Sequence, residues 1–245
     1  LGCALGAANR LPATAACFDT AAAADQRRRV AATHGQMAPA RRQYYGIPAH
    51  AAAETSRVTD EKVSLLLLGD ALTQQYAPAA VAAMKEAYRI TCREQPCGHT
   101  RQLLARLDDG LLDNDDCQTI AFSTDWADLA LDVDGNPTVG VDEFVANLTA
   151  IAERMRATGA KVYWMTLPPV PAGCADAVAD RAAEYNAAVA GALTALDVYV
   201  VDLHDFIRDK CPAFMAGATL ALDADARRRV AEHVAQAILF FGAQQ

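Results

Sequence analysis

Short apolar runs alternate with amphipathic stretches along residues 61–245 of this sequence. The first run, Val63 to Leu68, is apolar except for Ser64, and its length suits a strand that is buried on both faces. The stretch that begins at Val141 instead repeats apolar residues every three or four positions and ends at Gly159, as an amphipathic helix does. Alternation of strand and helix patterns predicts an α/β fold with a parallel sheet.

The pattern also predicts where each element begins and ends. The expected strands are Val63–Leu68, Tyr88–Cys92, Thr119–Ser123, Lys161–Leu167 and Asp197–Asp202. The expected helices are Thr73–Ala87, Thr100–Leu112, Val141–Thr158, Ala175–Leu196 and Asp223–Phe241. We therefore expect residues 61–245 to form a three-layer α/β/α domain around a five-stranded parallel sheet, flavodoxin-like in style.

Residues 1–60 follow a different pattern and are predicted to be an N-terminal extension of this domain. The segment is rich in alanine and holds one candidate helix, from an Asp19 N-cap to Gly35. The extension either packs along the flank of the domain or acts as an arm that docks a protein partner. The docking interpretation is based on clustered arginine and tyrosine, which are favoured at binding hot spots. The residues of this cluster are Arg41, Arg42, Tyr44 and Tyr45.

Composition limits the classes of partner and the compartment. The 245 residues carry a formal net charge of −8, which argues against nucleic acid as a partner. The apolar runs are far shorter than the ~18 residues that span a bilayer, so we expect no transmembrane segment. The first residue is Leu rather than Met, and we interpret the chain as a processed product or a fragment. We expect an organelle lumen or the secretory route as its location.

The cysteine and acidic residues are the candidate disulfide partners and metal ligands of this sequence. The seven cysteines include no CxxC pair, so no zinc site is expected. Their number suggests an oxidising compartment, and we predict a Cys174–Cys211 disulfide because both residues follow predicted strands at the same sheet edge. Scattered buried thiols are the alternative. The segment Asp132 to Glu143 has calcium-loop spacing, but Pro137 occupies the position that needs glycine, so we predict neither a metal nor any other cofactor.

The turn after the first predicted strand carries the chemistry that bears most on function. A buried parallel strand that ends in a tight turn before a helix places that turn at the carboxyl edge of the sheet, where open α/β folds have their sites. The sequence there reads Gly69-Asp70-Ala71-Leu72-Thr73. This segment resembles block I of the SGNH (GDSL-type) hydrolases, which reads Gly-Asp-Ser-Leu-Thr. Ala71 therefore stands in the place of the nucleophilic serine.

The resemblance to SGNH hydrolases continues through the other blocks to the end of the chain. Gly98 matches the block II glycine, whose N–H helps to hold the oxyanion. Ser123 stands in the place of the block III asparagine, whose side chain completes the oxyanion hole. An ungapped count back from Arg227 puts Ala218 and Ala221 in the places of the block V aspartate and histidine.

The resemblance therefore implies a catalytically degenerate member of the family. The family's nucleophile, base, orienting acid and oxyanion side chain are all replaced. An enzyme that loses its triad but keeps its oxyanion hole still accelerates the reaction only ~10³- to 10⁴-fold over water. We predict a pseudoenzyme that acts as a structural or interaction subunit of a larger protein assembly. Two alternatives stay open: a module that binds a ligand in the old acyl or acetyl-sugar pocket, and an esterase with atypical residues. The predicted pocket residues are Asp70, Ala71, Gly98, Ser123 and Ala221.

Two further groups of polar residues are interpreted as structural. Asp202, His204 and Asp205 follow the fifth predicted strand, and their order suits the start of a helix better than a relocated catalytic site. His233 lies among charged and small residues of the last predicted helix, so we expect a solvated surface histidine.

Overall fold

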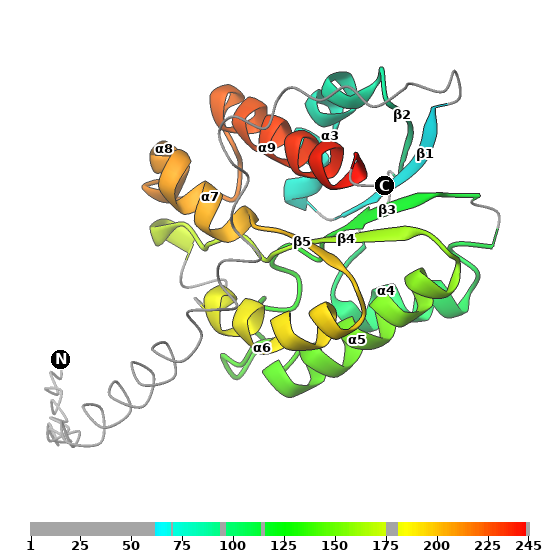
Figure 1. Ribbon diagram of the computed structural model, residues 1–245. Coiled ribbons are helices and arrows are strands. Elements are labelled where there is room, and N and C mark those ends of the chain that lie inside the picture. Colours follow the sequence, from blue (N-terminus) through cyan, green and yellow to red (C-terminus); the bar gives the residue numbers. More distant parts are fainter. Residues whose placement is uncertain (1–61, 70, 94–96, 114–115, 175–180, 244–245) are drawn as a thin grey trace, which may run out of the picture. The chain divides into compact units, whose positions relative to one another are not determined.

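The computed structural model describes residues 62–69, 71–93, 97–113, 116–174 and 181–243 (Figure 1). The predicted extension of residues 1–60, with its candidate helix and its arginine–tyrosine cluster, lies outside the described residues. Asp70 also lies outside them, so its predicted part in the pocket is untested.

Five parallel strands form one sheet in the spatial order β2-β1-β3-β4-β5. This arrangement confirms the predicted α/β fold and its five-stranded sheet. The buried β1 run pairs with β2 on one side and with β3 on the other, with Leu67 opposite both Cys92 and Ala121. The strands are β1 (Val63–Leu68), β2 (Tyr88–Cys92), β3 (Thr119–Phe122), β4 (Lys161–Met165) and β5 (Tyr199–Val201).

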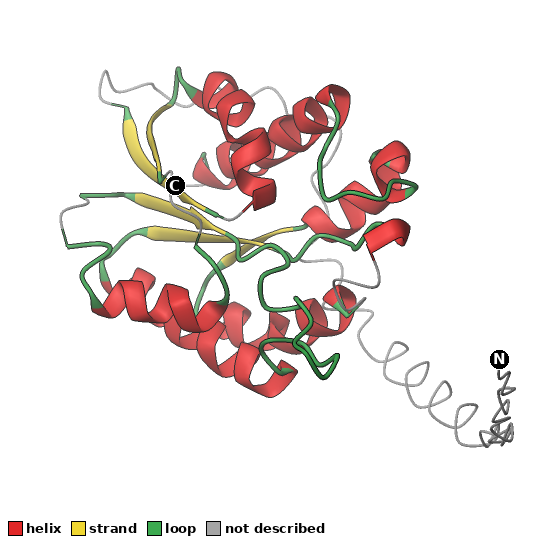
Figure 2. Cartoon of the chain, turned by 180° about the vertical axis from the view of Figure 1, so that it is seen from behind, coloured by secondary structure: helices red, strands yellow, loops and turns green. Residues whose placement is uncertain are grey.

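Helices cover both faces of the sheet, as the alternating pattern predicts. Figures 1 and 2 show α3 and α9 on one face of the sheet and α4, α5 and α6 on the other. On the first face α3 packs against α9, and on the second α4 packs against α5, which in turn packs against α6. These helices are α3 (Ala71–Met84), α4 (Thr100–Asp108), α5 (Val141–Ala157), α6 (Ala182–Ala195) and α9 (Ala224–Gly242).

The amphipathic stretch from Val141 forms α5 and buries its apolar stripe. Phe144, Leu148 and Ile151 are fully buried, and the Phe144 ring packs on the Tyr185 ring of α6 with centroids 5.1 Å apart. This contact joins the two helices on the same side of the sheet. The pattern of this segment therefore predicted both the element and the face that it buries.

The region after β5 holds two short helices, and of these the sequence predicted only the start of the first. They are α7 (Leu203–Lys210) and α8 (Pro212–Met215), and a 3₁₀ turn, η1 (Ala172–Cys174), follows β4. β4 ends at Met165, two residues earlier than predicted, because Thr166 turns its hydroxyl toward the start of α7. That hydroxyl accepts hydrogen bonds from the N–H groups of Leu203 at 2.9 Å and His204 at 3.0 Å.

Candidate functional site

Loops from distant parts of the chain meet at the carboxyl end of β1. The Ser123 N–H donates to the Leu68 carbonyl at 3.1 Å, which places the turn after β3 beside that strand end. The Cys97 N–H donates to the Gly69 carbonyl at 3.1 Å, which places the turn before α4 on the other side. The structure thus brings the Ser123 and Gly98 turns to the start of α3.

Gln75 holds a third segment against the first turn of α3. Its side-chain amide donates to the Leu220 carbonyl at 3.1 Å and to the Ala71 carbonyl at 3.2 Å. Its amide oxygen accepts the Leu222 N–H at 2.7 Å. The segment that carries Ala221 therefore lies beside the turn that carries Ala71, although 150 positions separate the two residues in the sequence. Both alanines are exposed.

Ala218 packs against the loop that follows β4. The Gly173 N–H donates to the Gly217 carbonyl at 3.1 Å. A Cβ at Gly173 would lie 2.5 Å from the Cα of Ala218, so the two backbones approach so closely that only glycine fits at this position. The segment from Ala218 to Ala221 is held at one end by this contact and at the other by Gln75.

Asp125 anchors the start of α3 from inside the protein. One of its carboxylate oxygens accepts the N–H groups of Leu72 at 2.9 Å and Thr73 at 3.2 Å. The other accepts the hydroxyls of Thr73 at 3.2 Å and Ser123 at 2.9 Å. Asp125 is 1% exposed. A buried negative charge therefore satisfies two N–H groups at the positive end of the helix dipole.

The hydrogen bond to Asp125 also determines what Ser123 can do. The Ser123 hydroxyl donates to the carboxylate and accepts the Asp125 N–H at 3.0 Å. Ser123 is fully buried, so its hydroxyl is engaged within the protein instead of facing a substrate. Asp125 is a site residue that the sequence pattern did not single out, although an aspartate two residues after a serine in a turn is a typical local hydrogen-bonding arrangement.

Asp128 lies in the same turn and binds the start of α4, as Asp125 binds the start of α3. Its carboxylate accepts the Thr100 N–H at 3.0 Å and the Thr100 hydroxyl at 2.6 Å. That hydroxyl also accepts a hydrogen bond from the Asn147 amide at 3.1 Å. Burial raises the pKa of Asp128, because loss of water disfavours the charged carboxylate. The turn after β3 therefore carries two buried carboxyl groups, and each caps a different helix.

Gly98 has a conformational role that is independent of catalysis. Its φ is +68°, and a Cβ there would lie 1.8 Å from the Gln102 side-chain oxygen. His99 follows as the N-cap of α4, and its ring accepts the Gln102 N–H at 3.3 Å. The left-handed backbone of the turn before α4 thus favours glycine at this position, whether or not its N–H ever faces an oxyanion.

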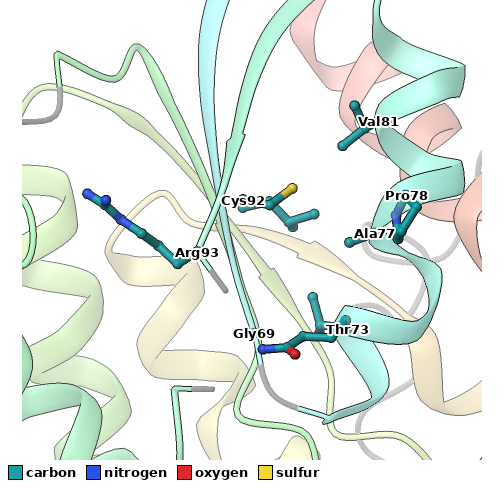
Figure 3. A pocket seen from close by; sticks show the side chains of 9 residues that line it. Gly69, Thr73, Ala77, Pro78, Val81, Cys92 and Arg93 are labelled. Atoms are coloured by element: carbon teal, nitrogen blue, oxygen red, sulfur yellow. The ribbon is translucent and has the colours of Figure 1, made fainter. Parts of the chain in front are cut away.

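A cavity of about 320 Å³ lies between α3 and the carboxyl ends of β1 and β2 (Figure 3). Ala71, Gly98, Ser123 and Ala221, the described residues of the predicted ligand pocket, do not line this cavity. It lies on the β2 side of α3 and contacts the predicted site only through its neighbours Gly69 and Thr73. The lining residues are Leu67, Gly69, Thr73, Gln74, Ala77, Pro78, Val81, Cys92 and Arg93.

The predicted Cys174–Cys211 disulfide is wrong. Both residues are free thiols, Cys174 half-buried and Cys211 buried. The prediction assumed that each cysteine directly follows a strand, but α7 separates β5 from Cys211 and carries it away from the sheet edge. Burial also raises the pKa of the Cys211 thiol, which makes it a poorer nucleophile for thiol–disulfide exchange.

The acidic group after β5 starts a helix, as predicted. The Asp202 side chain is the N-cap of α7 and accepts the Asp205 N–H at 3.0 Å. The His204 ring lies 3.1 Å from the Asp205 carboxylate, which also accepts a hydrogen bond from Arg208 at 2.6 Å. Asp202, His204 and Asp205 therefore lie where β5 connects to α7.

His233 is not the solvated surface residue that the sequence suggested. Its ring stacks on Phe206 of α7 with centroids 4.0 Å apart and an interplanar angle of 10°. Its Nε2 lies 3.0 Å from the Asp202 carbonyl oxygen. Burial lowers the pKa of this imidazole, since the charged form loses hydration. His233 therefore joins α9 to α7.

The acidic segment with calcium-loop spacing uses its carboxylates within the protein. The Asp132 carboxylate accepts the N–H groups of Asp134 at 2.9 Å and Asn136 at 2.8 Å, which closes a turn. Glu143 instead pairs with Arg101 of α4. In the part of the chain that the structure describes, no group of three or more His, Cys, Asp or Glu side chains is placed to hold a metal ion.

The sheet order and the loops around the start of α3 define the class of fold. The chain has the fold of the SGNH (GDSL-type) hydrolases. It is similar to an acetyl xylan esterase, AlAXEase, with a TM-score of 0.60 and 14% identity over 72% of this chain and 100% of that one. It is also similar to a lipase/acylhydrolase from Enterococcus faecalis, with a TM-score of 0.59 and 19% identity over 72% of this chain and 95% of that one.

A third similar structure is a catalytic mutant of an acetylxylan esterase from Geobacillus stearothermophilus. Its TM-score is 0.60 and its identity 15%, over 74% of this chain and 96% of that one. No family model matches the sequence, and no curated protein matches it. Among the helices that the structure describes, none is both long and apolar enough to cross a membrane.

The buried Asp125 carboxylate leads to a stability prediction. Asp125→Ala removes hydrogen bonds to a charged acceptor and leaves two helix N–H groups without a partner, so we expect a loss of about 3 kcal/mol in the free energy of unfolding. Urea denaturation followed by circular dichroism measures it. Asp134→Ala, at an exposed position in another turn, is the matched control and should cost less than about 0.5 kcal/mol. Equal losses in the two variants would contradict the prediction that the Asp125 hydrogen bonds stabilise the start of α3.

The position of His233 leads to a pH prediction. Its pKa is lower in the folded protein than in the unfolded chain, so its neutral form contributes stability above the unfolded pKa of about 6.5, and this contribution is lost as the pH falls through the folded pKa. We expect the wild type to lose stability relative to His233→Gln between pH 7.5 and pH 5, by about 1.4 kcal/mol for each unit of pKa depression. Thermal denaturation of both proteins across this range gives the difference. A constant difference would show that His233 titrates normally.

Proposed function

We propose that this chain is a non-catalytic SGNH-hydrolase-like protein that serves as a structural or interaction subunit of a larger protein assembly. The proposal rests on the hydrogen bonds of the Gln75 side chain, which hold the Ala221 segment against the Ala71 turn. In an active member of this fold, these two positions supply the hydroxyl that attacks and the imidazole that takes its proton. Here each position carries a methyl group, which can do neither.

The hydroxyl groups near this position support the same conclusion. Thr73 is 2% exposed, and its hydroxyl donates to Asp125. Ser123 is fully buried and donates to the same carboxylate. An activated nucleophile needs a neighbouring base and access to the substrate, and neither hydroxyl has such an arrangement.

The described histidines are engaged away from Ala71. His99 caps α4, His204 pairs with Asp205, and His233 lies between α7 and α9. Each ring has a contact that explains its place in the fold. The described part of the domain therefore supplies no imidazole to a hydroxyl at the start of α3, which supports a non-catalytic role.

An interaction role suits a domain that keeps its folded framework without its reactive groups. Hydrolase-like folds host many roles, and loss of the reactive groups leaves the surface available for binding. The proposed partners are other protein subunits, and the arginine–tyrosine cluster at residues 41–45 is the proposed docking arm. An organelle lumen or the secretory route stays the proposed location, although the free Cys174 and Cys211 thiols remove one argument for an oxidising compartment.

An esterase assay tests the catalytic part of this proposal. We expect hydrolysis of p-nitrophenyl acetate by the purified chain to match the buffer rate, and Ser123→Ala to leave it unchanged. The quadruple variant Ala71→Ser, Ser123→Asn, Ala218→Asp and Ala221→His carries the family's residues in the same framework and is the matched comparison. Wild-type turnover that a single side-chain substitution abolishes would overturn the proposal in favour of an esterase with atypical residues.

Native mass spectrometry of material taken from its source tests the assembly. We expect the chain to be detected with other protein subunits, at a mass well above the 26.0 kDa of the monomer. Dissociation at high ionic strength would indicate that polar contacts hold the assembly together. A lone monomer at native concentration would contradict the subunit role, whatever the outcome of the esterase assay.

A further inference from the structure

β2 is the first strand in the spatial order of the described sheet, so one of its sides faces no other described strand. We propose that this edge binds an extended segment of a partner protein as an added strand, and that acidic and apolar side chains alternate along that segment. The inference rests on the interaction role proposed above, for which it names a surface and the chemistry of the partner.

The pairing between β1 and β2 determines which backbone groups of β2 point outward. The register sets Leu67 of β1 opposite Cys92, and the Arg93 N–H donates to the Leu67 carbonyl at 3.2 Å. Along a strand, residues whose backbone groups face one neighbour alternate with residues whose groups face the other side. The Thr91 N–H therefore faces β1 as that of Arg93 does, and the N–H groups of Ile90 and Cys92 point to the open side.

The two edges of the described sheet differ in length and exposure. β2 has five residues, and Arg89, Thr91 and Cys92 are exposed. β5, at the opposite edge, has three residues, of which Val200 and Val201 are buried. Strand addition gains its affinity from consecutive main-chain hydrogen bonds. β2 is therefore the edge that is long and open enough to accept another strand.

The charges along β2 favour an acidic partner. Arg89 and Arg93 are the charged residues of the stretch 87–93, whereas the whole chain has a formal net charge of −8. Glu86 and Glu94 flank this stretch, and Glu94 lies outside the described residues. An acidic side chain on an added strand would lie beside an arginine of β2, and opposite charges on neighbouring strands attract.

The two faces of β2 differ in chemistry. Figure 3 shows the Cys92 side chain between β2 and α3, whereas the Arg93 side chain extends away from α3. Because successive side chains of a strand point to opposite faces, Arg89 shares the face of Arg93, and Ile90 shares the face of Cys92. Ile90 packs against the core, and the cavity beside α3 borders the same face. An added strand would thus meet basic groups on one face and apolar groups on the other.

The same charges argue against a second copy of the chain as the occupant. Two copies of β2 related by a two-fold axis would pair antiparallel, with Arg89 and Arg93 of both copies on one continuous face of the sheet. Like charges on neighbouring strands are destabilising, and basic side chains on an edge strand are a common protection against self-pairing. The edge is therefore suited to an acidic segment and unsuited to its own copy.

Amide hydrogen exchange in the full chain, followed by NMR, tests strand addition residue by residue. The probe is a short capped peptide in which valine and glutamate alternate, and a titration gives its Kd. In the free chain we expect the Ile90 and Cys92 amides to exchange fast, and the Thr91 and Arg93 amides, which are bonded to β1, to exchange slowly. The peptide at about ten times its Kd should slow exchange at Ile90 and Cys92 about tenfold, since only the free edge exchanges.

Two control peptides separate strand pairing from general charge attraction. The first has the same composition with its valines and glutamates in separate blocks, so it keeps the charge and loses the alternation. The second alternates valine with lysine, so it keeps the alternation and reverses the charge. We expect each to bind about tenfold more weakly than the valine–glutamate peptide.

Three variants of the full chain locate the binding at β2. Cys92→Pro removes an outward N–H, which an edge strand tolerates, so it should keep the fold and lose peptide protection at Ile90. Arg89→Glu should weaken binding of the valine–glutamate peptide about tenfold and favour the valine–lysine peptide. Lys210→Glu makes the same change of charge at an exposed position of α7, and it should behave as the wild type does.

Three outcomes would overturn the strand-addition proposal. The first is unchanged exchange at Ile90 and Cys92 with the peptide present, which would mean that the arginines only protect the edge. The second is equal binding of the block peptide, or equal weakening by Arg89→Glu and Lys210→Glu, which would indicate general charge attraction. The third is slow exchange at Ile90 and Cys92 in the free chain, which would show that the edge is already covered.

Dilution identifies such a cover. Recovery of fast exchange on dilution would assign it to a second copy, and slow exchange at every concentration would assign it to residues 1–61 of the same chain. Native mass spectrometry tests the subunit role independently of β2. Failure of the peptide to bind would therefore overturn the edge proposal and leave the proposed assembly to its own test.

Discussion

A single buried carboxylate, that of Asp125, joins the turn after β3 to the start of α3. Asp125 binds the first N–H groups of α3 and the hydroxyls of Thr73 and Ser123 at once. A charge removed from water is stable only when it is fully hydrogen-bonded, so the turn after β3 and the start of α3 must adopt one relative position. Asp128 connects the same turn to α4 through its hydrogen bonds with the Thr100 N–H and hydroxyl. The loops at the carboxyl edge of the sheet are therefore fixed by polar contacts beneath them, and their exposed residues are free to vary.

The framework at this edge of the sheet is held by groups other than the side chains at positions 71, 218 and 221. Gln75 bonds to backbone groups of residues 220–222, and backbone groups are present whatever side chain occupies position 221. The positive φ of Gly98 favours glycine in the turn before α4. The positions that carry reactive groups in an active hydrolase contribute little to this network. Alanine at positions 71, 218 and 221 is therefore compatible with this architecture.

The cavity and the predicted pocket around Ala71 lie against different parts of α3. The first turn of α3 faces the Ala221 segment through Gln75, and the following turns border the cavity through Ala77, Pro78 and Val81. β2 is an edge strand of the sheet, so no further strand closes the space between its carboxyl end and α3. An edge of this kind leaves apolar side chains with room beside them.

The sequence by itself determined the parts of this protein that follow from local pattern. The apolar runs predicted β1 and β2 with their observed bounds, the helical period predicted α5 and its buried face, and the Gly-Asp-Ala-Leu-Thr turn indicated the fold. Tertiary structure alone decided the rest. Asp125 meets residues more than fifty positions away, and Gln75 meets Leu220 at a separation of 145. The short α7 separated Cys211 from the strand that it was expected to follow. A hydrogen bond or a cavity depends on which side chains converge in space, and one-dimensional periodicity carries no information about that convergence.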